Sequence, residues 1–160
     1  GRVAFIVEGV TDNKLRTTSE IKNIFERAGG SMGGQGSVAY MFEKKGELRV
    51  KGSKLRVKSE EEESLELIDL GVEDIESFEE DGIRRYLVYV ESPELNTMGT
   101  KITQAGFEVE SSEIVMKPNT TVEISDKALA EKVIEFTGKL EDHDDVQKVY
   151  ANFDIDESVV

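Results

Sequence analysis

The amino-acid sequence predicts an α+β protein made of two small α/β-sandwich domains, one of them inserted into the other. Strand-like and helix-like patterns of apolar residues alternate along the chain, which indicates mixed secondary structure. The length of 160 residues suits one domain or two small ones. Hydrophobic residues make up 38% of the chain and charged residues 34%, so we expect thin cores and much solvated surface.

The first segment predicts a β-α-β unit. Residues 2–8 form a nearly continuous apolar run, typical of a strand covered on both faces. Thr17 and Glu20 have the spacing of a capping box, and apolar residues at helical intervals follow as far as the glycine pair at residues 29–30. The apolar run at residues 38–42 predicts a second buried strand.

The pattern changes after residue 46. Two Leu-Arg-Val triplets, on either side of Gly52, predict one bent strand or two short ones. Ser59 and Glu62 form a second capping box, before a helix that ends at Gly71.

A hairpin, a helix and a strand complete this middle region. Asp81-Gly82 is a strong turn signal between two strand-like runs, residues 72–78 and 83–90. Ser92-Pro93 starts a helix, and residues 107–115 form the closing strand. The order β-α-β-β-α-β predicts a ferredoxin-like domain over residues 47–118.

The last segment predicts one helix, capped by Ser125, and one strand at residues 146–153. A single helix and strand cannot form a domain alone. We therefore expect them to complete the first segment, which predicts a discontinuous outer domain of residues 1–46 plus 119–160.

Charge is distributed unevenly along the chain, whose net charge of −14 argues against simple binding to nucleic acid. Residues 1–50 carry eight basic against six acidic side chains, whereas residues 51–120 carry eight against seventeen. Residues 121–160 carry four against eleven. A basic ribbon with a single acid, Glu47, contains Lys44, Lys45, Arg49, Lys51, Lys54, Arg56 and Lys58.

The basic ribbon has two interpretations. It can contact phosphate, with Lys14 and Arg16 as companions, provided that its side chains converge where few carboxylates lie nearby. Alternatively, it is an exposed edge strand that lysines protect from aggregation.

The glycine-rich loop resembles a dinucleotide fingerprint only in its letters. Residues 34–39 read G-x-G-x-x-A, but a helix is predicted before them and a strand after them, the reverse of the order that such a site needs. Gly33, Gly34 and Gly36 instead predict an exposed backbone that can approach RNA closely.

Several function classes are not supported by the residues. The chain has no cysteine and one histidine, and no P-loop or Ser-His-Asp set is recognisable, so we expect no enzymatic activity, metal, cofactor or small-molecule substrate. His143, in an acidic segment, is interpreted as part of a solvated helix end.

No apolar run approaches about 20 residues, which predicts a cytoplasmic protein without a membrane partner. The chain opens within a strand, so we expect a preceding segment.

Two motifs resemble the YebC/PmpR family. The first combines D-N-x-x-R-T, at Asp12, Asn13, Arg16 and Thr17, with G-G-x-x-G-x-x-G-S-V-A-Y at Gly29 to Tyr40. The second is L-E-D-x-D-D-V-Q-x-V-Y-x-N, at Leu140 to Asn152. The resemblance implies three domains, of which the N-terminal helical one is missing here. It also implies a role in gene expression, as a DNA-binding transcriptional regulator or as a translation factor at the ribosome.

We therefore predict a non-enzymatic factor that binds DNA or RNA, within the ribosome or free. The predicted phosphate contacts are Lys14, Arg16, Lys44, Lys45, Arg49 and Lys51. The predicted loop contacts are Asp12, Asn13, Gly33, Gly34 and Gly36. The acidic segments favour the ribosome over bare duplex, because ribosomal proteins offer basic surfaces. The alternative is a protein-protein interaction module, and the oligomeric state stays open.

Overall fold

The chain is a mixed α+β protein that divides into two compact units. A computed structural model describes residues 3–34, 36–52 and 58–159. The outer unit comprises Gly1–Glu43 and Lys117–Val160, and the central unit comprises Lys44–Met116. None of the helices that the structure describes is both long and apolar enough to cross a lipid bilayer.

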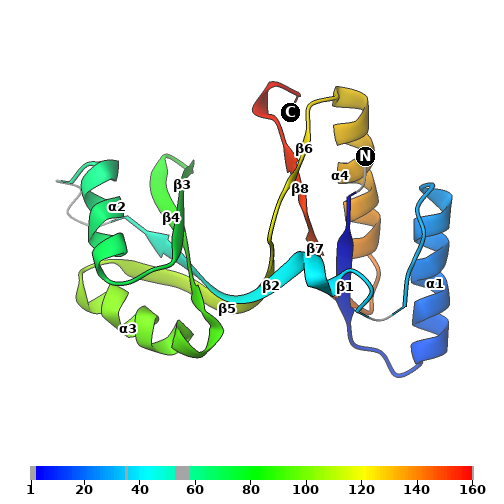
Figure 1. The fold of residues 1–160 in the computed structure, drawn as a ribbon, viewed down its shortest axis with the longest axis horizontal. Helices are drawn as coiled ribbons and strands as arrows, with labels where there is room; N and C mark the ends of the chain where they lie inside the picture. Colours follow the sequence, from blue (N-terminus) through cyan, green and yellow to red (C-terminus); the bar gives the residue numbers. More distant parts are fainter. Residues whose placement is uncertain (1–2, 35, 53–57, 160) are drawn as a thin grey trace. The chain divides into compact units, whose positions relative to one another are not determined.

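The outer unit combines two short sheets with two helices. Strand β1 (Phe5–Gly9) pairs antiparallel with β7 (Val146–Ala151), and β6 (Val122–Ile124) pairs parallel with β8 (Phe153–Ile155). Helices α1 (Lys14–Arg27) and α4 (Lys127–Glu141) contact each other, and α4 packs against β6 and β7 (Figure 1). Both ends of the sequence thus contribute to one unit.

Aromatic rings fill the space between these elements. The Phe5 ring of β1 lies 4.9 Å from Phe136 of α4, and the Phe136 ring lies 5.0 Å from Phe25 of α1, both pairs edge to face. Phe153 of β8 lies 6.1 Å from Phe5. Such pairs stabilise beyond the area that they bury. A small buried cluster of Ile124, Ala130 and Val133 extends this core.

Asn152 links three segments of the outer unit. Its side-chain oxygen accepts from the Ala4 N–H at 2.8 Å, and its own N–H donates to the Ala4 carbonyl at 3.2 Å. Its carbonyl accepts from the Val122 N–H at 2.6 Å. The side chain is buried, so these bonds replace water that cannot reach it. Asn152 therefore holds β1 and β6 to the junction between β7 and β8.

The structure corrects several predictions in the outer unit. Helix α1 begins at Lys14 and is capped by Asn13, one turn before the predicted start at Thr17. The predicted strand at residues 38–42 is wrong, because Ala39–Met41 form a 3-10 helix, η1, and strand β2 begins at Phe42. The predicted cap of α4, Ser125, is also wrong, since Asp126 accepts from the Ala128 N–H.

Strand β1 is also less buried than expected. Its residues are half-buried or exposed, so it is not covered on both faces. Apolar letters alone do not show whether a strand has one protein neighbour or two.

The central unit is a four-stranded sheet with two helices. Its strands are β2 (Phe42–Lys51), β3 (Asp74–Glu80), β4 (Ile83–Glu91) and β5 (Glu108–Pro118), in the order β3-β4-β2-β5. Helix α2 (Glu60–Asp69) follows β2, and α3 (Leu95–Gln104) follows β4 through a short 3-10 turn, Ser92–Glu94. Strand β2 is an inner strand, so the edge-strand interpretation is wrong for the ribbon residues that lie in it, Lys44 to Lys51.

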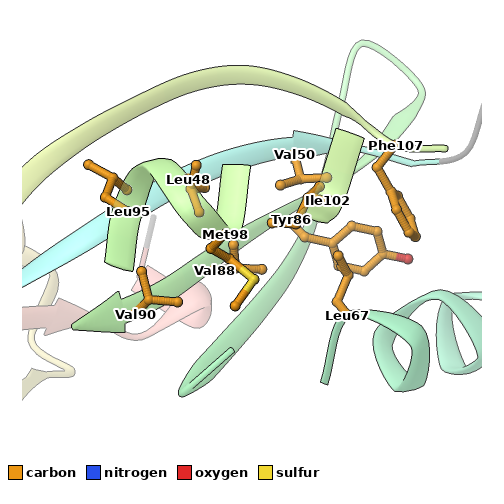
Figure 2. Packing of buried hydrophobic residues seen from close by; sticks show 10 residues of the cluster. All are labelled: Leu48, Val50, Leu67, Tyr86, Val88, Val90, Leu95, Met98, Ile102 and Phe107. Carbon is orange, nitrogen blue, oxygen red and sulfur yellow. The ribbon is translucent and has the colours of Figure 1, made fainter. Parts of the chain in front are cut away.

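Alternation along the strands builds the core of this unit. In β2, Leu48 and Val50 are buried on the face that meets the helices, and in β4 the residues that alternate on this face, Tyr86, Val88 and Val90, are buried with them. Arg85 and Tyr89 of β4 are buried as well, on the opposite face of the sheet. Figure 2 shows the buried side chains of these strands facing those of the helices. The cluster consists of Leu48, Val50, Leu67, Tyr86, Val88, Val90, Leu95, Met98, Ile102 and Phe107.

Local signals in the central unit behave as predicted. The Ser59 hydroxyl accepts from the Glu62 N–H at 3.2 Å and caps α2. Asp81 and Gly82 have φ angles of 55° and 72°, as a two-residue hairpin turn between β3 and β4 requires. The second Leu-Arg-Val triplet, residues 55–57, lies outside the described residues.

Candidate functional site

The loop before α1 contacts the loop before β7. The Val10 N–H donates to the Asp145 carbonyl at 2.9 Å. A Cβ atom at Gly9 would stand 2.6 Å from that carbonyl oxygen, so a larger residue would push the two loops apart. Segments from opposite ends of the sequence therefore meet through their backbones.

Arg16 lies in the first turn of α1 among three carboxylates. Its guanidinium is 3.3 Å from Glu20, 3.3 Å from Asp145 and 3.6 Å from Asp12. The Arg16 side chain is 53% exposed, so each pair contributes little to stability. The three carboxylates nevertheless balance the positive charge of Arg16 within the protein. Asn13 positions this turn, because its side chain accepts from the Arg16 N–H at 3.1 Å.

Thr17 connects α1 to the same aspartate. The Thr17 side chain is buried, and its hydroxyl donates to Asp145 Oδ2 at 2.6 Å. The Thr11 hydroxyl lies 2.7 Å from that of Thr17. Donation by Thr17, together with the bonds from Arg16 and Thr11, lowers the pKa of the Asp145 carboxyl.

His143 adds a second link between the two loops. Its Nδ1 accepts from the Asp145 N–H at 3.1 Å, so Nε2 carries the proton and faces Glu20 Oε2 at 3.2 Å. The His143 side chain is only 12% exposed. Its interpretation as part of a solvated helix end is therefore wrong, because the ring bridges the loop and α1.

These residues form one set, which we call the polar joint. Within the part of the chain that the structure describes, no group of three or more His, Cys, Asp or Glu side chains is arranged to hold a metal ion. The polar groups of the joint are donors and acceptors for one another, and their bonds link the segment around α1 to the segment before β7. Its members are Thr11, Asp12, Asn13, Arg16, Thr17, Glu20, His143 and Asp145.

The glycine loop joins α1 to η1. Gly36 has a φ of +78°, which favours glycine, and a Cβ at Gly33 would stand 2.4 Å from the Ser37 hydroxyl oxygen. Gly34 has no such restriction, since a Cβ there would meet nothing within 4 Å. All three are exposed. The sequence from Arg27 to Phe42 contains no carboxylate, so the loop places no fixed negative charge of its own before a ligand.

Three cations of β2 are matched by carboxylates. Lys45 Nζ lies 2.7 Å from Glu73 and 3.0 Å from Glu91, and these hydrogen bonds raise the Lys45 pKa. Arg49 pairs with Glu80 and stacks over the Phe78 ring, 5.1 Å from its centroid. It also lies 3.5 Å from a carboxylate of β5, and the Lys51 ammonium lies 4.0 Å from another. The condition of few nearby carboxylates is not met for Lys45, Arg49 and Lys51.

Lys14 and Lys44 differ from these cations. Both are exposed, and neither has an ion-pair partner within residues 3–34, 36–52 and 58–159. Lys58 pairs with Glu66. The remaining ribbon residues, Lys54 and Arg56, lie outside the described part. Of the predicted phosphate contacts, Lys14 and Lys44 thus retain a charge that no carboxylate among the described residues matches.

The polar joint brings together both motifs that resemble the YebC/PmpR family. Asp12, Asn13, Arg16 and Thr17 belong to the first motif, and His143 to Asp145 lie within the second. Sequence reasoning missed the contact between Thr17 and Asp145, which only the folded chain reveals. The signal available in the sequence was that Thr17 and Asp145 both stand at motif positions.

A family model described as the TACO1/YebC second and third domain matches residues 1–153. The chain belongs to this family.

Two relatives are similar in sequence to this chain over all or nearly all of its length. A probable transcriptional regulatory protein of Aquifex aeolicus is 39% identical over 160 residues, which are 100% of this chain and 61% of that protein. One of the same description from Thermotoga maritima is 40% identical over 158 residues, 98% of this chain and 59% of that protein. The chain therefore spans about three fifths of the length of these TACO1/YebC relatives.

A solved structure also resembles the chain. The crystal structure of a conserved hypothetical protein from Aquifex aeolicus has a TM-score of 0.82 and 39% sequence identity. The match covers 97% of this chain and 61% of that one. The mixed α+β architecture is thus shared with an experimentally determined TACO1/YebC-like structure.

Proposed function

We propose that this chain belongs to a non-enzymatic regulator of gene expression, which contacts nucleic acid or the ribosome through its glycine loop and its unmatched lysines. The relatives named probable transcriptional regulatory proteins support a regulatory role. The observation that carries the choice of surface is the carboxylate-free stretch from Arg27 to Phe42 in a chain of net charge −14. Phosphate is repelled least where fixed negative charges are absent.

The predicted phosphate contacts and the predicted glycine contacts divide into two groups. Lys14 and Lys44, with Gly33, Gly34 and Gly36, are exposed and available for phosphate. Arg16, Lys45, Arg49 and Lys51 already contact carboxylates, so a phosphate would have to displace these partners. We therefore assign the first group to direct contact, and the second to contacts that require displacement.

We favour a ribosomal partner over bare duplex DNA. The outer unit carries ten basic against sixteen acidic residues, and the central unit carries ten against eighteen. Such surfaces repel a uniform polyanion, whereas a ribosome presents both phosphate and basic protein. DNA-dependent transcriptional regulation is the competing form of the same proposal.

We also propose that the two units are separate domains and that the central one is a ferredoxin-like insertion. Its elements follow the order β2-α2-β3-β4-α3-β5, and its sheet order β3-β4-β2-β5 is compatible with that arrangement. The family model, which describes a second and a third domain, also supports two domains.

Co-sedimentation with ribosomes across a salt series tests the function, with a gel-shift titration on random duplex DNA run beside it. We expect ribosome binding to persist at moderate salt while duplex binding disappears. Tight, sequence-dependent duplex binding without ribosome association would instead support transcriptional regulation. Binding to neither, together with capture of a protein partner, would favour a protein-protein interaction module.

Charge variants locate the contact. The double variant Lys14→Gln/Lys44→Gln should weaken ribosome binding, because it removes the two unmatched positive charges. Lys127→Gln/Lys132→Gln is the matched control, since both lysines are exposed on α4. Equal losses in the two double variants would contradict the assignment of Lys14 and Lys44 to phosphate contact.

A further inference from the structure

Tyr40 is exposed at the end of the glycine loop. The residue is 75% exposed, while Phe42 is 5% exposed, and Val38, Ala39 and Met41 are half-buried. The 3-10 helix η1 thus directs one aromatic ring into solvent and its neighbours into the protein. Two of the other tyrosines, Tyr86 and Tyr89, are buried in the central unit.

The backbone that carries Tyr40 is held in place. The side-chain amide of Asn119 donates to the Tyr40 carbonyl at 3.0 Å, and the Asn119 N–H donates to the Met41 carbonyl at 2.9 Å. The Met41 N–H donates to the Val38 carbonyl at 3.0 Å, which closes the turn. With the backbone already fixed, only the side-chain freedom of the ring is lost when a ligand stacks on it.

The surroundings in sequence favour an anionic ligand. Tyr40 lies in the stretch from Arg27 to Phe42, the longest in the chain without a carboxylate. An exposed aromatic face beside a carboxylate-free glycine backbone can accept the flat π-face of a base, and the attached phosphates meet no fixed negative charge from this stretch. The bases of a duplex are stacked on both faces, so they would have to leave the helix to reach such a ring.

We propose that Tyr40 is a stacking platform for an unpaired nucleobase, so that this loop binds single-stranded RNA and not a duplex. The proposal rests on the proposed function and narrows its ligand. Tyr40 supplies the π-face, the glycine backbone allows close approach, and Asn119 positions the turn that presents the ring. Because stacking surfaces accept every base, sequence preference at this position should be weak.

Fluorescence anisotropy with a labelled, unstructured RNA of about 12 nucleotides, a length within known single-strand site sizes, tests this assignment. Tyr40→Ala should weaken binding roughly five- to a hundredfold, the range expected when one stacked base is lost. Tyr40→Phe should stay within about threefold of the wild type, because the ring is kept. Leu65→Ala is the control for loss of an exposed apolar side chain, since Leu65 is 61% exposed on α2.

Two further measurements separate stacking from charge. The dependence of affinity on salt should be the same for Tyr40→Ala and the wild type, because no phosphate contact is removed. The chain has no tryptophan, so Tyr40→Trp places a single indole at the platform, and saturating RNA should quench its fluorescence. Binding without quenching, or equal affinities of Tyr40→Ala and the wild type, would overturn the role of Tyr40 while leaving the proposed function intact.

The duplex provides the last comparison. A duplex of the same sequence should bind more weakly than the single strand, and Tyr40→Ala should change that binding less than twofold. Preference for the duplex would overturn the choice of ligand. Failure to bind RNA, DNA and ribosomes alike would overturn the proposed function as well.

Discussion

The outer and central units are stabilised in different ways. The central unit has a continuous cluster of ten buried apolar residues between its sheet and its helices. The outer unit has a smaller buried cluster, several phenylalanine contacts and two sets of specific polar contacts, at Asn152 and at the polar joint. Hydrophobic contacts tolerate some change of geometry, whereas hydrogen bonds require particular atoms at particular distances. The two units should therefore respond differently to substitution.

Leu67→Ala in the central unit should have the largest effect on stability. Leu67 is fully buried, and removal of its side chain leaves a cavity that costs about 2–5 kcal/mol. Leu65→Ala, two residues earlier on α2, should change stability by less than about 0.5 kcal/mol because that side chain is exposed. Urea denaturation measures both, and equal losses would contradict the described core.

Asn152→Ala should cause the next largest loss of stability, and this loss should be confined to the outer unit. The Ala4 N–H would lose its 2.8 Å acceptor in a partly buried place, which costs about 1–3 kcal/mol. Hydrogen exchange should show loss of protection around Ala4 and β6, while the central unit keeps its protection. Asn23→Ala, at an exposed position of α1, is the control. A uniform loss across both units would contradict a local role.

Thr17→Val should have a smaller effect, of about 1 kcal/mol, because it removes one hydroxyl and keeps the shape of the side chain. Thr18→Val, at the exposed neighbouring position, should have little effect. Thermal or urea unfolding of the two variants at neutral pH measures the difference. Equal stabilities of the two variants would show that the 2.6 Å contact with Asp145 does not stabilise the joint.

The polar joint should also weaken in acid. The pKa of Asp145 is lower in the folded chain than the value of about 3.9 in an unfolded one. Its contribution is therefore complete above about pH 4 and is lost as the pH falls through the folded value. Asp145→Asn should reduce the loss of stability below pH 4, as should Thr17→Val. An unchanged pH profile in both variants would contradict the assigned cause.

Sequence patterns predicted the central unit better than the outer one. The Ser59 cap, the Asp81-Gly82 turn and the apolar spacing of Leu95, Met98 and Ile102 are local signals, and the structure confirms them. The outer unit depends on contacts between distant segments, which spacing does not reveal. The Thr17-Glu20 spacing, for example, resembles a cap, but Thr17 is buried against Asp145.

The candidate site shows the same division. The basic ribbon is evident in the sequence, but its pairing is not, because the carboxylates that match Lys45 and Arg49 come from β3, from β4 and from the residue before β3. Tyr40 was part of a predicted buried strand, and only the 3-10 turn reveals its exposure. Strand pairing and turn geometry therefore determine which residues can meet a ligand.

Lys44 and Lys45 allow the most direct test of the account, because they are adjacent in the chain and differ in pairing. Lys44 is exposed without an ion-pair partner in the described ranges, and Lys45 is held by Glu73 and Glu91. The measurement is the slope of log affinity for single-stranded RNA against log salt concentration, for Lys44→Gln and Lys45→Gln. We predict that Lys44→Gln reduces the magnitude of the slope by about 0.7, the value for one phosphate contact, and that Lys45→Gln leaves it unchanged. A reduced slope for Lys45→Gln with an unchanged one for Lys44→Gln would contradict the account.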